Sequence, residues 1–375
     1  MTVNLAIAQE HAVGEKRVSL IPETAKKLIM LGVHISMVKG AGVKSHFLDA
    51  DYIDVNMVAN SQDAYRHAHV ILSVNPPNVE EIELMPEGTV LIGILKPFED
   101  KSRLAALNKK KITAFSLEFL PRISRAQSMD VLSSQASCAG YQCGLIAAGN
   151  CSKFFPMLTT AAGTIRPARV LVIGAGVAGL QAIATCKRLG ALVEAYDVRS
   201  VAREQIESLG AKFIDTGVTA EGADGYAREL SEEEKMTQVE KLTKVISNAD
   251  VVITTASVPG KKAPVIITAG MVQHMKYGAI VIDMAAETGG NCELTKAGEH
   301  VIFNDVNVYG PVNLASRMPT HASELYAKNI YNFLSPWIKD GALAFDWSDE
   351  LLVGTLLCRD GSIVHPKIKQ FLGEL

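Results

Sequence analysis

The 375-residue sequence predicts an α/β protein of two domains, each a mostly parallel sheet flanked by helices, with a cleft separating them. Short apolar runs rich in β-branched residues alternate with helical patterns over the first 120 residues, and again after residue 169. A hydrophobic content of 48% over this length is enough for two cores. Between the two regions, residues 133–155 carry small apolar side chains at helical spacing, which is typical of a long connecting helix.

The first region alternates strand and helix patterns in the way that a parallel sheet requires. Strands are expected at residues 3–9, 34–38, 69–74, 89–95 and 112–117, with helices after residue 22 and near residues 61–67 and 101–110. No glycine-rich turn follows any of these strands. We therefore expect this domain to lack a phosphate-binding loop.

The last segment of the chain is assigned to the same domain. A helix expected at residues 324–334 leads to residues 351–364, which read as strand and turn. The termini of two-lobed proteins usually lie together. The expected domains are therefore residues 1–133 with 311–375, and residues 134–310.

The second region opens on a strand, a glycine-rich turn and a helix. The apolar residues 170–173 lead into Gly174-Ala175-Gly176-Val177-Ala178-Gly179, and the helix is expected to end at Leu189. Gly174 would make the tight turn, Gly176 would let the backbone approach a pyrophosphate, and Gly179 would let the helix pack close to the strand. The pattern predicts a dinucleotide-binding Rossmann domain, and the alternation of strands and helices in the first region makes that domain Rossmann-like.

An acidic residue ends the next strand, which is expected at residues 191–196. Asp197 stands about 20 residues beyond the glycines, where a carboxylate can accept hydrogen bonds from an adenosine ribose. Because this carboxylate would repel a 2′-phosphate, the sequence favours NAD over NADP. Arg199 leaves an alternative open, since an arginine here could face a 2′-phosphate, although a solvated arginine or a pyrophosphate partner fits better.

The rest of the second domain is expected to complete its sheet early. Helices near residues 201–209 and 268–275 and strands at 212–214, 250–256 and 279–284 follow, and a strand at 301–304 leads the chain away. Residues 215–234 are polar, contain glycine and fit neither a strand nor a buried helix. We expect a mobile loop there, because long irregular segments in compact domains are usually lids or linkers.

Composition excludes several classes of protein. The net charge is −3 and no basic block is longer than Lys109-Lys110-Lys111, which argues against nucleic acid or an anionic membrane surface as the main partner. Six scattered cysteines without a CxxC pair indicate a reducing cytoplasm. The sequence predicts no transmembrane helix, no signal peptide and no metal site.

A polar stretch follows the strand expected at residues 112–117. It reads Pro121-Arg122-Ile123-Ser124-Arg125-Ala126-Gln127-Ser128-Met129-Asp130, and strand ends are where α/β proteins bind ligands. Arg122, Gln127 and Asp130 offer a cation, an amide and a carboxylate, which suit a phosphate or a carboxamide better than acid–base catalysis. From spacing alone, a capped loop that opens a helix is at least as good an interpretation.

Several segments together resemble the NAD(H)-binding domain of proton-translocating nicotinamide nucleotide transhydrogenase, over nearly the whole chain. They are residues 121–130, residues 160–164 with Arg166-Pro167-Ala168-Arg169, the Gly174 turn, Asp197-Val198-Arg199, and Ala285-Ala286-Glu287-Thr288-Gly289-Gly290-Asn291-Cys292. The resemblance implies a soluble, cytoplasmic NAD(H)-binding alpha subunit, held at the inner membrane through its partners and active only with them. NADH bound here would pass a hydride directly to NADP(H) on a beta subunit, coupled to proton translocation in a membrane subunit, and the chain would form a homodimer.

The resemblance also implies roles for individual residues. Arg122, Gln127 and Asp130 would be catalytic and fix the nicotinamide end, with Ser133 assisting. Gly176, Val177, Asp197 and Arg199 would hold the pyrophosphate and ribose, while Gly225, Gln238 and Ser257 would line the adenine side and Tyr226 would lie in the mobile loop. The remaining expected cofactor contacts are Ile123, Ser124, Ser128, Met129, Gly174, Ala175, Gly179 and Val198.

Alanine dehydrogenases are related and provide the alternative, an amino-acid dehydrogenase. That family handles its substrate with a lysine, a histidine and an aspartate, where this chain has Ser73-Val74-Asn75-Pro76, Leu95-Lys96-Pro97 and Glu287. Removing a proton from an amine needs a base with a suitable pKa, whereas hydride transfer between two nicotinamides needs none. The substitutions therefore favour a transhydrogenase.

Overall fold

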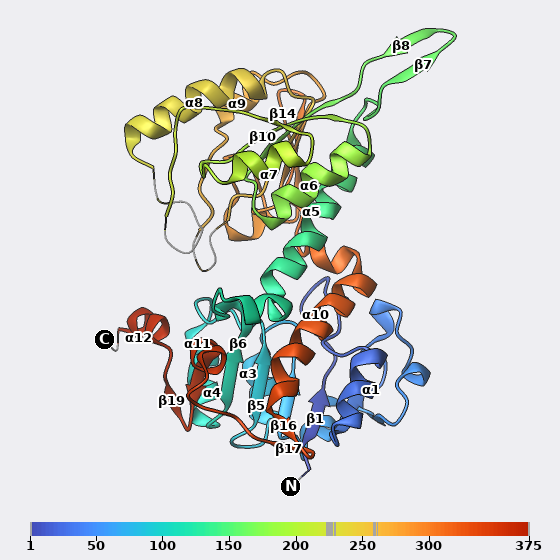
Figure 1. Ribbon diagram of the computed structural model, residues 1–375, viewed down its shortest axis with the longest axis vertical. Helices are drawn as coiled ribbons and strands as arrows, with labels where there is room; N and C mark the ends of the chain where they lie inside the picture. Colours follow the sequence, from blue (N-terminus) through green and yellow to red (C-terminus); the bar gives the residue numbers. More distant parts are fainter. Residues whose placement is uncertain (1, 223–227, 229, 258–259, 261, 374–375) are drawn as a thin grey trace. The chain divides into compact units, whose positions relative to one another are not determined.

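The computed structural model describes residues 2–222, 228, 230–257, 260 and 262–373. The chain forms two compact units (Figure 1): Met1–Gln135 with Ser316–Leu375, here unit 1, and Ala136–Ala315, here unit 2. Helix α5 (Val131–Asn150) contains one of the two boundaries. Both units are mostly parallel sheets flanked by helices, which confirms the predicted fold class.

Unit 1 is built on an eight-stranded sheet. In spatial order the strands are β19 (Ser362–Ile363), β18 (Leu356–Arg359), β6 (Thr113–Ser116), β5 (Val90–Gly93), β4 (Val70–Leu72), β1 (Asn4–Ile7), β2 (His34–Val38) and β3 (Asn56–Val58). Strands β6 to β3 run parallel, while β18 and β19 add antiparallel edges. The C-terminal tail thus extends the sheet made by the first third of the chain.

Helices cover both faces of the unit 1 sheet. They are α1 (Pro22–Met30), α2 (Ser61–Tyr65), α3 (Val79–Leu84), α4 (Lys101–Lys109), α10 (Pro319–Leu334), α11 (Glu350–Thr355) and α12 (Pro366–Leu372). Side chains alternate along each strand, so Leu5 and Ile7 pack in one core cluster with α1 and α10, whereas Ala6 packs in the other with α2 and α4. A small sheet of β16 (Ile338–Lys339) and β17 (Ala342–Leu343) follows α10.

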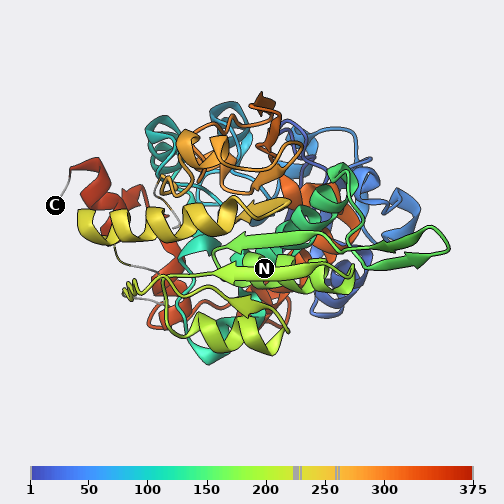
Figure 2. The same cartoon turned by 90° about the horizontal axis from the view of Figure 1, so that it is seen from above.

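Unit 2 holds a seven-stranded sheet. In spatial order the strands are β11 (Lys212–Phe213), β10 (Leu192–Tyr196), β9 (Arg169–Ile173), β12 (Val251–Thr254), β13 (Ile280–Asp283), β15 (Val306–Tyr309) and β14 (His300–Phe303). Helices α6 (Val177–Arg188) and α7 (Ala202–Ser208) share one core cluster with α5, and α8 (Glu232–Ile246) and α9 (Ala269–Gln273) pack on the other face. A hairpin of β7 (Leu158–Thr160) and β8 (Gly163–Ile165) extends away from the sheet (Figures 1 and 2).

The expectation that the second sheet ends at residues 279–284 is wrong. Strand β15 pairs parallel with β13, and β14 pairs antiparallel with β15. The two strands are joined by Asn304 and Asp305, which both have positive φ (46° and 57°), as a tight two-residue hairpin turn requires. Val306 and Val308 are buried and alternate with partly exposed residues, a pattern that marks a strand.

Other boundaries differ because helix caps decide them. Residues 350–355, expected as strand, form α11 because the Asp349 side chain accepts from the N–H of Leu351 (2.8 Å). The expected loop at 215–234 ends early, since Ser231 and Glu234 form a capping box that starts α8 at Glu232. Helix α10 begins five residues before the expected position, at Pro319, and both β3 and the Asn78-capped α3 are elements that the sequence analysis missed.

Candidate functional site

The glycine turn of unit 2 joins β9 to α6. Gly174 has a φ of +93°, its N–H donates to the carbonyl of Tyr196 (2.8 Å), and its carbonyl accepts from the hydroxyl of Thr255 (2.9 Å). A β-carbon on Gly179 would lie 1.8 Å from the oxygen of Gly174. The turn therefore depends on glycine at both positions, in the roles that the sequence predicts for them.

Gly176 differs from these two glycines. It is the N-cap of α6 with a φ of −74°, and a β-carbon there would meet no atom within 4 Å. The first N–H groups of a helix have no partner within the helix, and together with the helix dipole they attract anions. Open space in front of such a helix start fits a pyrophosphate, and Val177, 43% exposed, begins the helix beside it.

The Asp197 carboxylate, at the end of β10, is already hydrogen-bonded within the protein. Oδ2 accepts from the N–H of Ala175 (2.7 Å) and Nη2 of Arg199 (2.7 Å), and Oδ1 accepts from the N–H and Nε of Arg199 (both 2.9 Å). A carboxylate has about four lone-pair positions. A ribose hydroxyl would therefore have to displace the Arg199 side chain, which the sequence analysis had not expected to pair with Asp197.

The electrostatics keep Asp197 charged. Burial raises the pKa of the carboxyl group, but the hydrogen bonds from Arg199 and Ala175 and the positive charge of Arg199 outweigh it, so the pKa is lower than its ordinary value. The buried anion also fixes the glycine turn through Ala175. Val198, the next residue, is partly buried, and its carbonyl accepts from the N–H of Ala220 (2.8 Å).

The residues expected on the adenine side fall into three situations. Gln238 on α8 is buried, and its amide donates to the hydroxyl of Tyr196 (2.8 Å), so it braces α8 against β10. Ser257 is exposed, three residues after the end of β12. Gly225 and Tyr226 lie outside the described residues.

The sequence analysis missed a second buried carboxylate, Asp283 at the end of β13. It is fully buried and accepts from the hydroxyls of Thr254 (3.0 Å) and Thr295 (2.6 Å) and from the N–H groups of Ala285, Asn291 and Cys292 (2.7–3.0 Å). Its signal was present in the sequence, since it ends an apolar strand as Asp197 does. The acid organises the 285–292 segment of the family resemblance.

In unit 1, the polar loop after β6 forms the short 3-10 helix η4 (Ser124–Met129) and then α5. Arg122, Ser124, Gln127 and Ser128 are exposed, Ile123 is partly buried and Met129 is buried. No hydrogen bond joins the Gln127 amide to another described residue. The loop thus presents polar groups to solvent on a well-anchored backbone.

Asp130 is the residue that starts α5. Its carboxylate accepts from the N–H (2.9 Å) and the hydroxyl (2.6 Å) of Ser133. The open alternative, a capped loop that opens a helix, therefore describes Asp130 and Ser133 as they stand. A cap does not prevent ligand binding, because a carboxylate has further acceptor positions.

A buried polar cluster lies in unit 1 behind this loop. The Glu15 carboxylate pairs with the Arg17 guanidinium (Nη2 to Oε2, 2.6 Å), and neither side chain is more than 8% exposed. Asn75 donates to both Glu15 (2.8 Å) and Glu10 (3.1 Å), and the Glu10 carboxylate also accepts from the N–H groups of Val74 and Asn75 (2.6 and 3.0 Å). These residues come together from positions up to 65 apart in the chain.

The two carboxyl groups of this cluster have opposite pKa shifts. Removal from water raises the pKa of Glu10 from 4.5 to about 7, and the charge of Glu15 adds to the rise. Burial also raises the pKa of Glu15, but hydrogen bonds from Arg17 and the Arg17 charge lower it to about 2. Folded protein thus keeps the Glu10 proton between pH 4.5 and 7, where the unfolded chain releases it.

The stability of unit 1 should therefore fall as pH rises from about 4.5 to about 7 through Glu10, because the folded state binds more protons than the unfolded state in that window. Glu10→Gln should flatten this slope, whatever its effect on absolute stability. Urea unfolding midpoints measured across the window test this, with Glu80→Gln, an exposed acid of the same unit, as control. An unchanged slope in Glu10→Gln would contradict the assignment.

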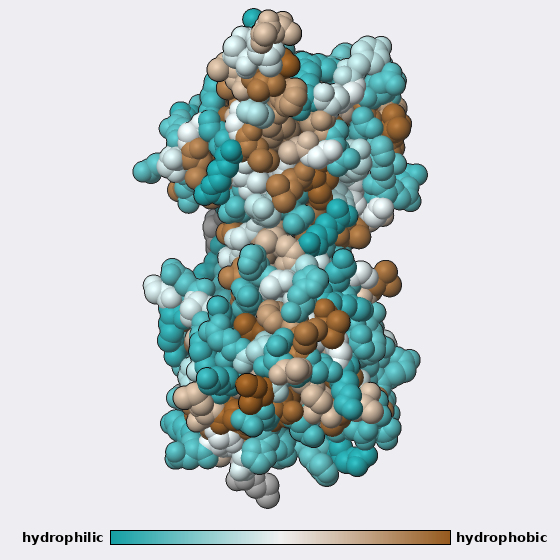
Figure 3. Space-filling view, turned by 90° about the vertical axis from the view of Figure 1, so that its right-hand side faces the viewer, coloured by the Kyte–Doolittle hydropathy of each residue, from teal (hydrophilic) through white to brown (hydrophobic). Residues whose placement is uncertain are grey.

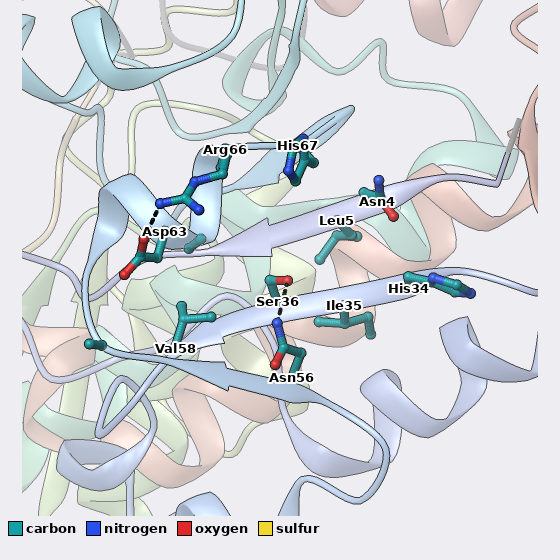
Figure 4. Close-up of a pocket in the computed structure, with 12 residues that line it drawn as sticks. Asn4, Leu5, His34, Ile35, Ser36, Asn56, Val58, Asp63, Arg66 and His67 are labelled. Atoms are coloured by element: carbon teal, nitrogen blue, oxygen red, sulfur yellow. Dashed lines mark hydrogen bonds and ion pairs between the residues drawn. The ribbon is translucent and has the colours of Figure 1, made fainter.

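A hollow of about 490 Å³ in unit 1 lies elsewhere (Figure 4), lined by β1, β2, β3 and α2. Asn56 donates to Ser36 (3.3 Å) and Arg66 pairs with Asp63 (2.7 Å) at its wall. None of the expected site residues lines it. Within the described ranges, no three His, Cys, Asp or Glu side chains gather as metal ligands, and no helix is long and apolar enough to cross a membrane.

A parallel sheet whose first strand leads through a glycine turn into a helix, with an acid ending the next strand, defines a dinucleotide-binding protein of the Rossmann class. Two family models match the chain: Alanine dehydrogenase/PNT, N-terminal domain, over residues 6–139, and Alanine dehydrogenase/PNT, C-terminal domain, over residues 143–366. The chain belongs to the alanine dehydrogenase/PNT family.

Within the family, transhydrogenase sequences are the more similar. The chain is 45% identical to the first of the chains that make up NAD(P) transhydrogenase subunit alpha in Rhodospirillum rubrum, covering 98% of this chain and 99% of that one. The crystal structure of transhydrogenase from Sinorhizobium meliloti superimposes with a TM-score of 0.85 at 40% identity, covering 97% and 99%. Alanine dehydrogenase of Staphylococcus saprophyticus is 27% identical, covering 78% and 74%. The resemblance stated from the sequence is confirmed.

Proposed function

We propose that the protein is the NAD(H)-binding alpha subunit of a proton-translocating transhydrogenase. NADH bound here would deliver a hydride directly to NADP+ held by a beta subunit, coupled to proton translocation in a membrane subunit that keeps this cytoplasmic chain at the inner membrane. The observation that carries the proposal is full-length similarity to the R. rubrum alpha-subunit chain at 45% identity. The bound nicotinamide would supply the redox chemistry.

The side chains of unit 1 support transhydrogenation over oxidation of an amino acid. The Arg17 guanidinium, a candidate to bind a substrate carboxylate, is paired with Glu15 and Gln135. The Asn75 amide is hydrogen-bonded to Glu10 and Glu15 and cannot take up a proton. Lys96 lies near Glu99 (3.7 Å), so these positions offer no available base for an amine.

Both units carry candidate cofactor residues. In unit 2, the Gly174–Gly179 turn and Val177 would hold the pyrophosphate, Asp197, Val198 and Arg199 the adenosine ribose, and Gln238 and Ser257 the adenine side. In unit 1, Arg122, Gln127 and Asp130 would orient the nicotinamide end, with Ile123, Ser124, Ser128, Met129 and Ser133 around them. These residues would hold and orient the nucleotide without moving a proton.

The function is tested by mixing the purified chain with an NADP(H)-binding transhydrogenase partner and following reduction of acetylpyridine adenine dinucleotide. An alanine-plus-NAD assay of the chain alone runs in parallel. Transfer only in the presence of the partner supports the proposal. Alanine oxidation would instead make the chain an amino-acid dehydrogenase, and neither activity would leave a silent NAD-binding module.

Cofactor choice follows from Asp197. NADH should bind at least about tenfold more tightly than NADPH, because Asp197 accepts from a free 2′-hydroxyl once Arg199 turns away and repels a 2′-phosphate. Asp197→Ala should lose most NADH affinity in titrations. The exposed Asp215, which pairs with Arg203, provides a matched control, since Asp215→Ala removes an Asp–Arg pair of the same unit. Equal affinity for NADH and NADPH would remove Asp197 from the ribose site.

We also propose a homodimer in which a second copy covers the β7–β8 hairpin. Residues 156–166 are all exposed, among them Met157 (65%) and Ile165 (42%), and a two-stranded hairpin alone is marginally stable in water. Figure 3 shows apolar surface interspersed with polar surface on the side of unit 2 from which the hairpin extends. Sedimentation equilibrium of the chain and of Met157→Ser with Ile165→Ser tests this; a monomeric wild-type chain would exclude it.

A further inference from the structure

Arg17 connects two segments of unit 1 that are far apart in the chain. Its Nε and Nη2 donate to the two oxygens of Glu15 (2.8 and 2.6 Å), and its Nη1 donates to Oε1 of Gln135 (2.8 Å). Arg17 and Gln135 are each 8% exposed. Buried charge-assisted hydrogen bonds of this length are directional, so the guanidinium fixes where Gln135 lies.

Gln135 is held from a second side. Its Nε2 donates to the carbonyl of Ala322 on α10 (3.1 Å). Gln135 stands on the first turns of α5, two residues after Ser133, whose N–H and hydroxyl bind the Asp130 carboxylate. The start of α5, and with it Asp130, is therefore tied both to the segment of Arg17 and to α10.

The loop before α5 is tied to α10 as well. The carbonyl of Ser128 accepts from the amides of Asn329 (2.8 Å) and Asn332 (3.0 Å). Gln127 has no hydrogen bond of its own to another described residue and is exposed. Its position thus depends on the backbone, and the backbone depends on ties at Ser128 on one side and at Gln135 on the other.

We propose that Gln135, held by Arg17, is a positioning residue that sets the place of Gln127 and Asp130 for hydride transfer. This rests on the function proposed above. Gln135 and Arg17 are buried and hydrogen-bonded within unit 1, whereas the glycine turn and Asp197 belong to unit 2, so their effect is on geometry and not on the hold on NADH. A shift of about 1 Å in reacting groups can cost on the order of a hundredfold in rate.

Gln135→Met tests the proposal, because methionine keeps the length of the side chain and removes both ties. We expect hydride transfer to the partner-bound nucleotide to fall at least about tenfold, with the Kd for NADH within about twofold of wild type. Backbone amides of residues 124–135 should exchange hydrogen faster in the free protein. Gln142→Met is the matched control: it lies two turns further along α5 and has no side-chain hydrogen bond to another described residue, so it should behave as wild type in all three measurements.

Gln135→Glu separates positioning from a loss of folding. Glutamate keeps an acceptor for Arg17, so it should recover most of the transfer rate that methionine loses. Wild-type transfer by Gln135→Met, loss of NADH affinity in proportion to rate, or no recovery in Gln135→Glu would each overturn the proposal. If the wild-type chain itself transfers no hydride, the proposed function fails, while unchanged exchange at residues 124–135 in Gln135→Met would separately overturn the tie.

Discussion

Gly176→Ala should fold nearly as stably as the wild-type chain and lose at least about tenfold in NADH affinity, whereas Gly179→Ala should destabilise unit 2 by about 3 kcal/mol or more. A β-carbon at position 176 meets no atom within 4 Å, and the φ of −74° suits alanine. The same β-carbon at position 179 would lie 1.8 Å from the Gly174 oxygen. One methyl group thus acts on binding at one position and on folding at the other.

The Gly174 oxygen cannot move away from such a methyl group. It accepts from the Thr255 hydroxyl, and Gly174 at φ +93° is itself held by its N–H bond to Tyr196. Relief would require α6 to lift from β9. Calorimetry and NADH titration on both variants measure the two effects, and an N-cap change from glycine to alanine accounts for no more than about 1 kcal/mol at Gly176. Wild-type NADH affinity in Gly176→Ala would show that no phosphate approaches this turn.

Much of the fold follows from local patterns in the sequence. The expected strand at residues 34–38 has the bounds of β2, and the helix after the glycine turn stops at the C-cap Leu189, before Gly190 with its φ of +91°. These features depend on neighbouring residues only. The β14–β15 hairpin and α11 were missed because each depends on one polar residue, Asn304 or Asp349, whose side chain or backbone choice competes with the apolar pattern around it.

The candidate site was predictable as a set of positions and less so as a set of contacts. Spacing placed Asp197 at the end of β10, but its choice between a ribose and Arg199 depends on how the turn orients both side chains. The pairing of Asn75 with Glu10 and Glu15 joins residues about 60 positions apart, which no periodicity reports. Gln135 and Asn329 were missed for the same reason, since their partners come from distant segments.

Gln127→Asn should lower hydride transfer to the partner-bound nucleotide by about a hundredfold while weakening NADH binding by much less. The substitution draws the amide back by one methylene, and a displacement on the order of 1 Å is enough for such a loss when two rings must be aligned. The exposed Gln127 side chain makes no hydrogen bond to another described residue, so the shorter amide disturbs no contact of the free protein. Stopped-flow transfer rates and NADH titrations on the same variant measure the two effects.

Two comparisons isolate the geometry of this loop. Arg122→Ala should reduce both affinity and rate, because an arginine lost from a charged ligand removes contacts made before the transition state as well. Gln62→Asn makes the same change at an exposed glutamine of α2 in the same unit and should alter neither. If Gln127→Asn loses affinity and rate in equal measure, the loop clamps the nucleotide and does not align it. If it loses neither, the η4 loop is scaffold, and the groups that align the nicotinamides must be sought among other residues of the chain or on its partner.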